Sequence, residues 1–314
     1  MLQAMQYRRR FRFRFRFRFR FRSSAKAPAV LRIMTLGLSC ALVAFTASCA
    51  DVARDSRAQG IVWQVDNATT NPVGDWNLFG AHQLLIQWVA VDDTAFVANT
   101  GLPTAATLPD WARIGREPWA RDVVLGLAGY ADENRARANV EKLVKESAQV
   151  ARVPLPLHVT GYYFPVEVDP TWADAPKLAE WLRPLPRPLW ISVYDRSNVG
   201  GKALAEWLAA WLPSDVGVFF QDGCGVYARG PAVTREYLDA LSSKLGRDRV
   251  RVIAEAFRPS EHGGFRAATA DELRLQLAAY RGYFAYLFDG PHYVSNELAR
   301  QLAPRAARRR GAGP

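Results

Sequence analysis

The sequence is poor in cysteine and histidine, and each shortage excludes a kind of site. Its three cysteines are Cys40, Cys49 and Cys224, and it has four histidines. Two cysteines lie near the N-terminus, so the remaining chain carries Cys224 alone and cannot form an internal disulfide. No two histidines have the spacing of a zinc-ligand pair, so we expect no metal and no other cofactor. A site in which His292 joins nearby carboxylates is the metal-binding alternative.

Acidic residues are missing from the N-terminal segment. Residues 1–49 contain eleven Lys or Arg and no Asp or Glu, from totals of 41 basic and 30 acidic residues. The remaining residues 50–314 therefore carry 30 basic and 30 acidic groups. The net charge of +11 belongs to the leader. A neutral body argues against a nucleic-acid partner.

The leader combines a repeat with the features of an export signal. Arg and Phe alternate from Arg10 to Arg22, which is typical of a low-complexity run. After Lys26 and Arg32 comes an apolar stretch of about fifteen residues, the length of a signal-peptide core. The stretch ends in FTASC, which resembles a bacterial lipobox with Cys49 as the lipidated residue.

These features predict an exported protein, located in the periplasm or anchored to a membrane through lipid on Cys49. Thr46 stands where such motifs usually have Leu, so cleavage nearby by an ordinary signal peptidase is an alternative. We expect residues 1–49 to form the low-complexity leader and lipoprotein signal peptide, and residues 50–59 a linker. Residues 299–314, which end in RAARRRGAGP, are expected to form a basic disordered tail.

Between these ends, an apolar run followed by a polar residue recurs eight times. Runs of this kind are typical of strands buried on both faces of a parallel sheet. They are GIVWQVD, HQLLIQW, DVVLGLAG, LHVTGYYF, RPLWISVYD, DVGVFFQDG, RVRVIAEAF and YFAYLFDG, starting at Gly60, His82, Asp122, Leu157, Arg187, Asp215, Arg249 and Tyr283. The pattern predicts an α/β fold, a single-domain (β/α)8 TIM barrel over residues 60–298, close to the roughly 250 residues usual for such barrels.

Amphipathic segments between the runs predict the helices. The segment from Thr269 opens with a Thr-x-x-Glu capping box completed by Glu272, and it closes on Gly282. No convincing helix follows the first run, so the first two units carry the weakest signal. A doubly wound open sheet is the alternative. That fold requires a glycine-rich phosphate loop after its first strand, and QVDNATTNP contains none.

Polar residues stand at the C-terminal ends of the predicted strands, where barrel enzymes have their active sites. We expect these side chains to converge on one rim. Aromatic faces suit the C–H face of a sugar, while carboxylates and amides bind its hydroxyls. The pattern therefore predicts a polysaccharide or oligosaccharide partner. The candidate substrate-binding residues are Gln64, Asp66, Gln87, Trp88, Tyr163, Tyr194, Asp195, Gln221, Asp222 and Asp289.

Two glutamates are the candidate catalytic residues. Glu167 follows the fourth run, in GYYFPVEVD, and Glu255 closes the seventh, in VIAEAF. Glycoside hydrolysis requires two carboxyl groups that flank one bond. Glutamates on the fourth and seventh strands are the positions used by clan-A glycoside hydrolases, and the sequence resembles that group.

The same two motifs, with FFQDGCG and GIVWQVDN, more closely resemble a bacterial family of exported TIM-barrel proteins described as a domain of unknown function. The resemblance covers roughly residues 60–295. It implies a barrel with a glycosidase-like site.

The sequence departs from clan A around Glu167. The acid/base glutamate of those enzymes usually follows Asn, whereas Val166 stands here. Glu167 is also expected beyond Pro165, in the loop instead of on the strand. Asp195 and Asp222 are alternatives for the second carboxyl group.

Three hypotheses follow. In the first, the protein is a retaining glycoside hydrolase of an exopolysaccharide or cell-envelope glycan. Glu255 would attack the anomeric carbon, and Glu167 would act as acid and then as base. In the second, the protein is a carbohydrate-binding TIM-barrel lipoprotein without catalysis. The third is a barrel with other chemistry, such as a lyase or deacetylase.

Overall fold

The computed structural model describes residues 57–304 of the chain. The predicted leader, the lipidation site Cys49, most of the predicted linker and residues 305–314 of the predicted tail lie outside the described residues. Among residues 57–304, none of the helices combines the length and the apolar character needed to cross a membrane.

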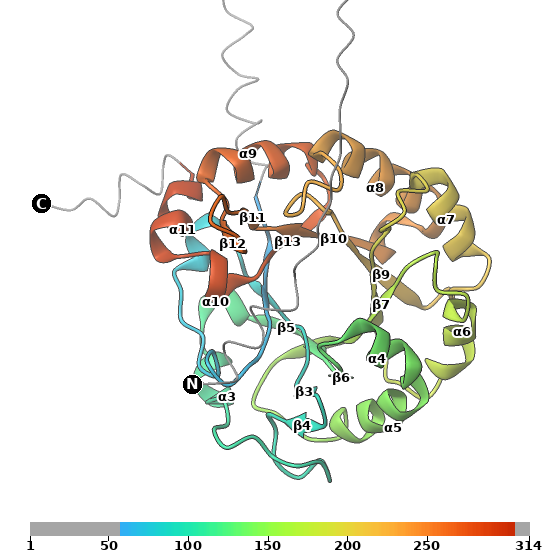
Figure 1. Cartoon of the computed structure of the whole chain (residues 1–314). Helices are drawn as coiled ribbons and strands as arrows, with labels where there is room; N and C mark the ends of the chain where they lie inside the picture. The colour runs from blue at the N-terminus through green and yellow to red at the C-terminus, as the bar shows by residue number, and fades with distance from the viewer. Residues whose placement is uncertain (1–56, 305–314) are drawn as a thin grey trace, which may run out of the picture.

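Eight parallel strands close into a barrel, each paired with its neighbours on both sides (Figure 1). Each of the eight predicted runs overlaps one of these strands, which confirms the single-domain (β/α)8 barrel. In chain order they are β1 (Gly60–Trp63), β2 (Gln83–Ile86), β5 (Asp122–Gly126), β7 (Val159–Val168), β8 (Leu189–Val193), β9 (Val216–Gln221), β10 (Val250–Glu255) and β13 (Phe284–Phe288).

Helices form an outer ring around these strands (Figure 1). They are η1 (Trp76–Phe79), α3 (Trp111–Ile114), η2 (Pro118–Ala120), α4 (Glu133–Ala138), α5 (Val140–Val150), η3 (Ala175–Lys177), α6 (Leu178–Trp181), α7 (Gly201–Ala209), α8 (Pro231–Leu245), η4 (Arg247–Arg249), α9 (Ala270–Ala279), α10 (Gly290–Tyr293) and α11 (Asn296–Leu302). The elements between β1 and β5 are short, in line with the weak signal there. The predicted capping box of Thr269 and Glu272 is present at the start of α9.

Two small sheets are added to the C-terminal side of the strands. The turn between β3 (Ala90–Val91) and β4 (Thr94–Ala95) follows β2, and β3 also pairs with β6 (Ala128–Gly129). The hairpin of β11 (Phe257–Pro259) and β12 (Phe265–Ala267) lies between β10 and α9.

A layer of buried apolar side chains, one from each strand, lies inside the barrel. Rings dominate the layer, with Phe219 packing edge-to-face on Tyr286 at 5.0 Å and on Tyr163 at 5.5 Å between centroids. A plug of this kind closes the barrel below its C-terminal mouth, so a site can open only above it. The members of the layer are Val62, Leu85, Val124, Tyr163, Trp190, Phe219, Ile253 and Tyr286.

Both expected ends of the barrel need correction. The backbone N–H of Gln59 donates to Ala285 and its side-chain oxygen accepts from the Ala285 N–H, both at 2.9 Å. Gln59 therefore belongs to the barrel and not to a linker. At the other end, α11 continues through Leu302 because Leu298 and Ala299 are buried against the outer core. Residues 299–302, predicted as part of the tail, thus belong to this helix.

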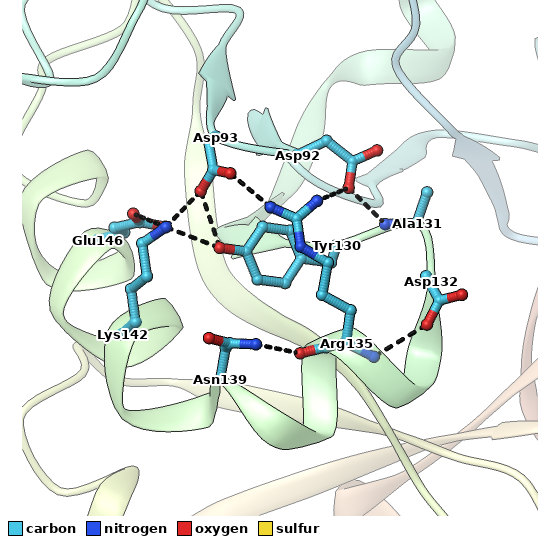
Figure 2. Close-up of polar contacts among 9 residues, drawn as sticks. All are labelled: Asp92, Asp93, Tyr130, Ala131, Asp132, Arg135, Asn139, Lys142 and Glu146. Carbon is cyan, nitrogen blue, oxygen red and sulfur yellow. Dashed lines mark hydrogen bonds and ion pairs between the residues drawn. The ribbon is translucent and has the colours of Figure 1, made fainter.

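An exposed ionic cluster, the Asp93 network, ties the β3–β4 turn to α4 and α5 (Figure 2). Asp93 accepts hydrogen bonds from Tyr130, Arg135 and Lys142, and the first two of these are 2.8 and 2.6 Å long. The guanidinium of Arg135 also stacks over the Tyr130 ring at 3.8 Å. The remaining acids of the network, Asp92 and Glu146, pair with Arg135 and Lys142. The network therefore holds α4 from its outer side.

Candidate functional site

A bulge in β7 brings Glu167 onto the inner face of the barrel. Phe164 is paired with Ile191 of β8, and the next pair is Glu167 with Ser192. Pro165 and Val166 are thus extra residues on β7, as in a β-bulge that redirects a side chain. The expectation that Glu167 lies in the loop is wrong, because β7 continues through Val168.

Glu167 lines a cavity of about 100 Å³ at the mouth of the barrel. The Gln221 amide nitrogen donates to Glu167 Oε2 at 3.0 Å and to Ser192 Oγ at 2.7 Å. Burial raises the pKa of Glu167, and the nearby charge of Arg137 and the bond from Gln221 only partly oppose this. The lining residues are Val62, Leu85, Gln87, Tyr163, Glu167, Gln221, Ile253 and Phe288.

The cavity offers one unused acceptor. Gln87 Oε1 is buried and has no hydrogen-bond partner among the described residues. A buried carbonyl oxygen without a donor costs about 1–3 kcal/mol. A ligand hydroxyl entering the cavity would remove that cost, whereas the apolar floor gives it no alternative partner.

Glu255 lies beside this cavity but does not line it. Its carboxylate accepts the backbone N–H of Gly225 at 2.6 Å. A Cβ at position 225 would lie 2.8 Å from that carboxylate and 2.5 Å from the Phe257 ring, so the approach requires glycine. Burial, and then the charge of Asp222, raise the pKa of Glu255 to about 8.

Asp222 is fully buried and faces away from the cavity. Its carboxylate accepts the backbone N–H groups of Cys224 and Glu255, at 3.1 and 3.2 Å. It also accepts the Tyr280 hydroxyl at 2.8 Å and the Gln276 amide. Burial raises the pKa of Asp222, and these bonds oppose the rise. Asp222 thus supports the segment that carries Glu255 instead of facing a ligand.

The hydroxyl group of Tyr194 is affected by the charges of both candidate catalytic glutamates. Burial raises the pKa of its hydroxyl to about 12, and the charges of both Glu255 and Glu167 add to the shift. The ring of Tyr194 also lies 5.2 Å from the guanidinium carbon of Arg229. The Tyr194 hydroxyl is therefore within electrostatic reach of both carboxyl groups.

Asp195, the other alternative carboxylate, is turned away from this space. It is fully buried and accepts the Tyr237 hydroxyl of α8 at 2.7 Å. Trp88 is likewise part of the outer core, 5 % exposed, with its indole N–H bonded to the Val65 carbonyl at 2.9 Å. Neither presents a face to a ligand in the cavity.

Asp66 and Asp289 lie at the mouth, where both contact His292. The His292 Nδ1 is 2.8 Å from Asp289, and its Nε2 is 3.6 Å from Asp66. These two carboxylates raise the pKa of His292 to about 10. Burial alone would raise the pKa of Asp66, but bonds from His292 and Thr69 lower it to about 2. The backbone of Gln64 donates to Asp289. Asp66, Asp289 and His292 therefore form an ionic cluster in which both carboxylates are paired with the histidine.

Sequence reasoning missed Glu133 and Arg137, which face Glu167 from α4. Arg137 lies 3.3 Å from Glu133 and 3.9 Å from the Glu167 carboxylate. Burial, and then the charge of Glu167, raise the pKa of Glu133 to about 9. Glu133 and Arg137 have the i, i+4 spacing of an ion pair on the helix that follows the third strand, and this spacing was the available signal in the sequence. We call Glu133, Arg137, Glu167 and Gln221 the mouth cluster.

Aromatic rings flank Glu255 on its outer side. Phe257 packs against Phe265 at 4.8 Å and against Tyr293 at 5.2 Å between ring centroids. Tyr227, in the loop after β9, is 65 % exposed, and Phe265 is 38 % exposed. These rings could stack on a bound sugar. Trp63 and Trp76, by contrast, are fully buried.

Two further features bear on what the site can hold. Among residues 57–304, no three His, Cys, Asp or Glu side chains are grouped closely enough to hold a metal ion. A larger hollow of about 460 Å³ lies between residues 99–101 and 149–154. It is open, and Arg152 is the one charged residue in its lining, so the smaller cavity with its carboxyl and amides is the better candidate.

Comparisons with known proteins agree on the fold alone. No family model matches the sequence, and no curated protein matches it either. A solved structure from Bacteroides thetaiotaomicron, titled as that of a "putative alpha-L-fucosidase", is similar with a TM-score of 0.54. The two chains are 14 % identical, and the match covers 86 % of this chain and 96 % of that one. The similarity thus agrees with the TIM-barrel fold of the chain and shows the fold alone.

Proposed function

We propose that the protein is a glycoside hydrolase of an exopolysaccharide or cell-envelope glycan. The observation that carries the proposal is the placement of Glu167 and Glu255. They come from the fourth and seventh barrel strands, and both act on the Tyr194 hydroxyl at the mouth. Two carboxyl groups around one space are what hydrolysis of a glycosidic bond requires.

The proposed roles follow from the surroundings of each carboxyl. Glu167 lines the cavity and burial raises its pKa, which favours the protonated form that a general acid needs. Glu255 would be the nucleophile in a retaining mechanism, with its carboxylate fixed by the Gly225 N–H. Gln87, Gln221 and Tyr163 line the same cavity and would bind sugar hydroxyls.

A second candidate function is carbohydrate binding without catalysis. One feature favours it: burial and the charge of Asp222 raise the pKa of Glu255, which disfavours the carboxylate form that a nucleophile needs. The two functions differ in their expected pH dependence. A hydrolase that uses Glu255 becomes more active as the pH rises toward about 8, while the binding protein shows no turnover at any pH.

The test is a glycan screen of the full-length chain with two variants and a control. Glu167→Gln and Glu255→Gln each remove one ionisable carboxyl at nearly constant shape, and Glu180→Gln changes an exposed glutamate of α6. We expect each of the first two to lower kcat by about 1,000-fold or more, and the control to leave it unchanged. Full turnover by Glu255→Gln would remove that residue from its role. Binding of a glycan without cleavage by the wild type would favour the second function.

We also propose that the protein is exported and held at a membrane by lipid on Cys49. The lipobox-like FTASC and the preceding apolar stretch support this. Replacement of Cys49 by Ala is expected to move the protein from the membrane fraction to the soluble fraction. An unchanged distribution would contradict the anchor and would leave the proposed chemistry of the barrel unaffected.

A further inference from the structure

The backbone of Glu167 is held by side chains of α4. Its N–H donates to Glu133 Oε1 at 2.8 Å. Its carbonyl oxygen accepts from Arg137 Nε at 3.1 Å and from Arg137 Nη2 at 2.8 Å. Both backbone polar groups of this one residue are therefore bound by two side chains that stand one helical turn apart.

We call these bonds from Glu133 and Arg137 to the Glu167 backbone the clamp. The bulge in β7 explains why Glu167 needs them. The pairing of β7 with β5 ends at Tyr163, and the extra residues Pro165 and Val166 separate Glu167 from the last paired position. Among residues 57–304, no strand is paired with Glu167 on the side of β7 that faces β5. Unpaired backbone groups inside a protein are costly and leave a segment mobile. The α4 side chains occupy the place that a strand would have taken.

We propose that Glu133 and Arg137 are positioning residues that fix the Glu167 carboxyl in the cavity. The proposal rests on the proposed function to the extent that Glu167 is the general acid. Gln221 holds the Glu167 carboxyl from the opposite wall at 3.0 Å. The clamp on the backbone and the bond on the side chain together leave Glu167 one orientation, as a preorganised catalytic acid requires.

The charges around Glu133 fit this role. One arginine, Arg137, lies between two carboxyl groups, and it cannot fully compensate both. The other charged groups that act on Glu167 are Arg196, at 4.0 Å and 65 % exposed, and Asp169. The raised pKa of Glu133, about 9, means that Glu133 is neutral near pH 7 and binds the Glu167 N–H through its carbonyl oxygen.

A neutral Glu133 gives the proposal a sharp test. Glutamine keeps a carbonyl acceptor at this position, so Glu133→Gln should preserve the clamp, whereas Glu133→Ala removes it. Arg137→Lys keeps the charge but cannot reproduce both bonds to one carbonyl. Glu141→Gln, at an exposed position of the neighbouring α5, is the matched control.

The first readout is independent of any substrate. Amide hydrogen exchange at Glu167 and the carboxyl pKa of Glu167 are measured by NMR on the full chain labelled at glutamate. We expect Glu133→Ala and Arg137→Lys to speed exchange at Glu167 by about 10-fold and to shift that pKa. Glu133→Gln and Glu141→Gln should leave the exchange rate within about 3-fold of the wild type. Unchanged exchange and pKa in Glu133→Ala would overturn the proposal.

The second readout is catalysis on a glycan cleaved by the wild type. Misplacement of a catalytic acid lowers kcat, and we expect Glu133→Ala to lose about 10- to 100-fold in kcat with KM nearly unchanged. Glu133→Gln should restore most of the loss. If exchange at Glu167 responds as expected but no glycan is cleaved by the wild type, the clamp is supported and the hydrolase is not. Equal kcat in Glu133→Ala and wild type would contradict the positioning role.

Discussion

The short helix α4 stands between two polar clusters of similar composition, in which Asp93 and the two mouth glutamates have opposite pKa shifts. On its outer side, Arg135 enters the Asp93 network (Figure 2). On its inner side, Arg137 enters the mouth cluster. In each cluster acids outnumber bases, yet the pKa of Asp93 is lowered while those of Glu133 and Glu167 are raised.

Solvent access explains the contrast. The side chains of Asp93 and Lys142 are 38 % and 50 % exposed. Water therefore solvates the negative charge that the two bases of the network do not neutralise. The side chains of Glu167 and Arg137 are 19 % and 16 % exposed, and burial there disfavours the charged carboxylate. A dense ionic network at the surface is therefore structural. A smaller cluster in a half-closed mouth, with carboxyl groups whose pKa values are raised, is suited to proton transfer.

The largest expected effect comes from Asp222, which is fully buried and supports the segment that carries Glu255. Asp222→Ala would leave Tyr280, Gln276 and two backbone N–H groups without their acceptor. We expect it to lower the free energy of unfolding by about 3–5 kcal/mol. Asp93→Ala should cost no more than about 1–2 kcal/mol, because water replaces the lost partner. Urea unfolding of both variants measures the difference, and equal losses would remove the distinction between the two regions.

The second-largest expected effect is a difference in how the stability contributed by Glu133 and by Asp93 depends on pH. Glu133 has a folded pKa of about 9, raised above its ordinary value, so the folded protein binds more protons than the unfolded chain from about pH 4.5 to 9. Stability therefore falls as the pH rises through this window. Glu133→Gln should flatten the fall.

Asp93 behaves in the opposite way. Its folded pKa lies below the ordinary value, mainly through the Lys142 bond, so its contribution is present above about pH 4 and is lost as the pH falls through the folded pKa. Asp93→Asn should change stability near neutral pH and have little further effect in strong acid. Melting temperatures of the variants and wild type from pH 3 to 9 check both signs. A steeper fall in Glu133→Gln would contradict the assignment.

The barrel could be predicted because each strand is encoded locally. The run VGVFFQ of β9, for example, is apolar on both faces and ends in a polar residue, whichever strands lie beside it. The position of Glu167 could not be predicted in the same way. A proline in a run predicts the end of a strand, but here β7 bulges at Pro165 and then resumes.

The direction of each rim side chain was also beyond the sequence. Asp195, Asp222 and Glu255 all stand at strand exits, yet only Glu255 lies beside the cavity. A one-residue change of register turns a side chain to the other face of the sheet. Glu133 escaped notice because its role depends on a backbone N–H of β7, and a sequence does not show which backbone groups lack partners.

Removal of the Tyr130 hydroxyl tests whether hydrogen bonds from an uncharged side chain, as well as ion pairs, stabilise the Asp93 network. The Tyr130 hydroxyl donates to Asp93 and accepts from Lys142, each at 2.8 Å, and the residue is 4 % exposed. Tyr130→Phe should lower the free energy of unfolding by about 1 kcal/mol. Its effect on kcat should be small if the mouth cluster depends on Glu133 and Arg137 alone. A large loss of kcat at unchanged stability would show that the two faces of α4 are coupled.

The smallest expected effect is also the most sensitive to salt. Lys142→Met keeps the apolar stem of the side chain and removes its ion pairs with Asp93 and Glu146. Because Lys142 and Asp93 are exposed, the loss should be about 0.2–1 kcal/mol in dilute buffer and should vanish near 1 M salt, where charges are screened within about 3 Å. The pKa of Glu167, set by burial, should change little over the same salt range. Unfolding curves and carboxyl titrations at low and high salt make the comparison, and equal salt sensitivity in both clusters would show that the mouth is as open to water as the outer network.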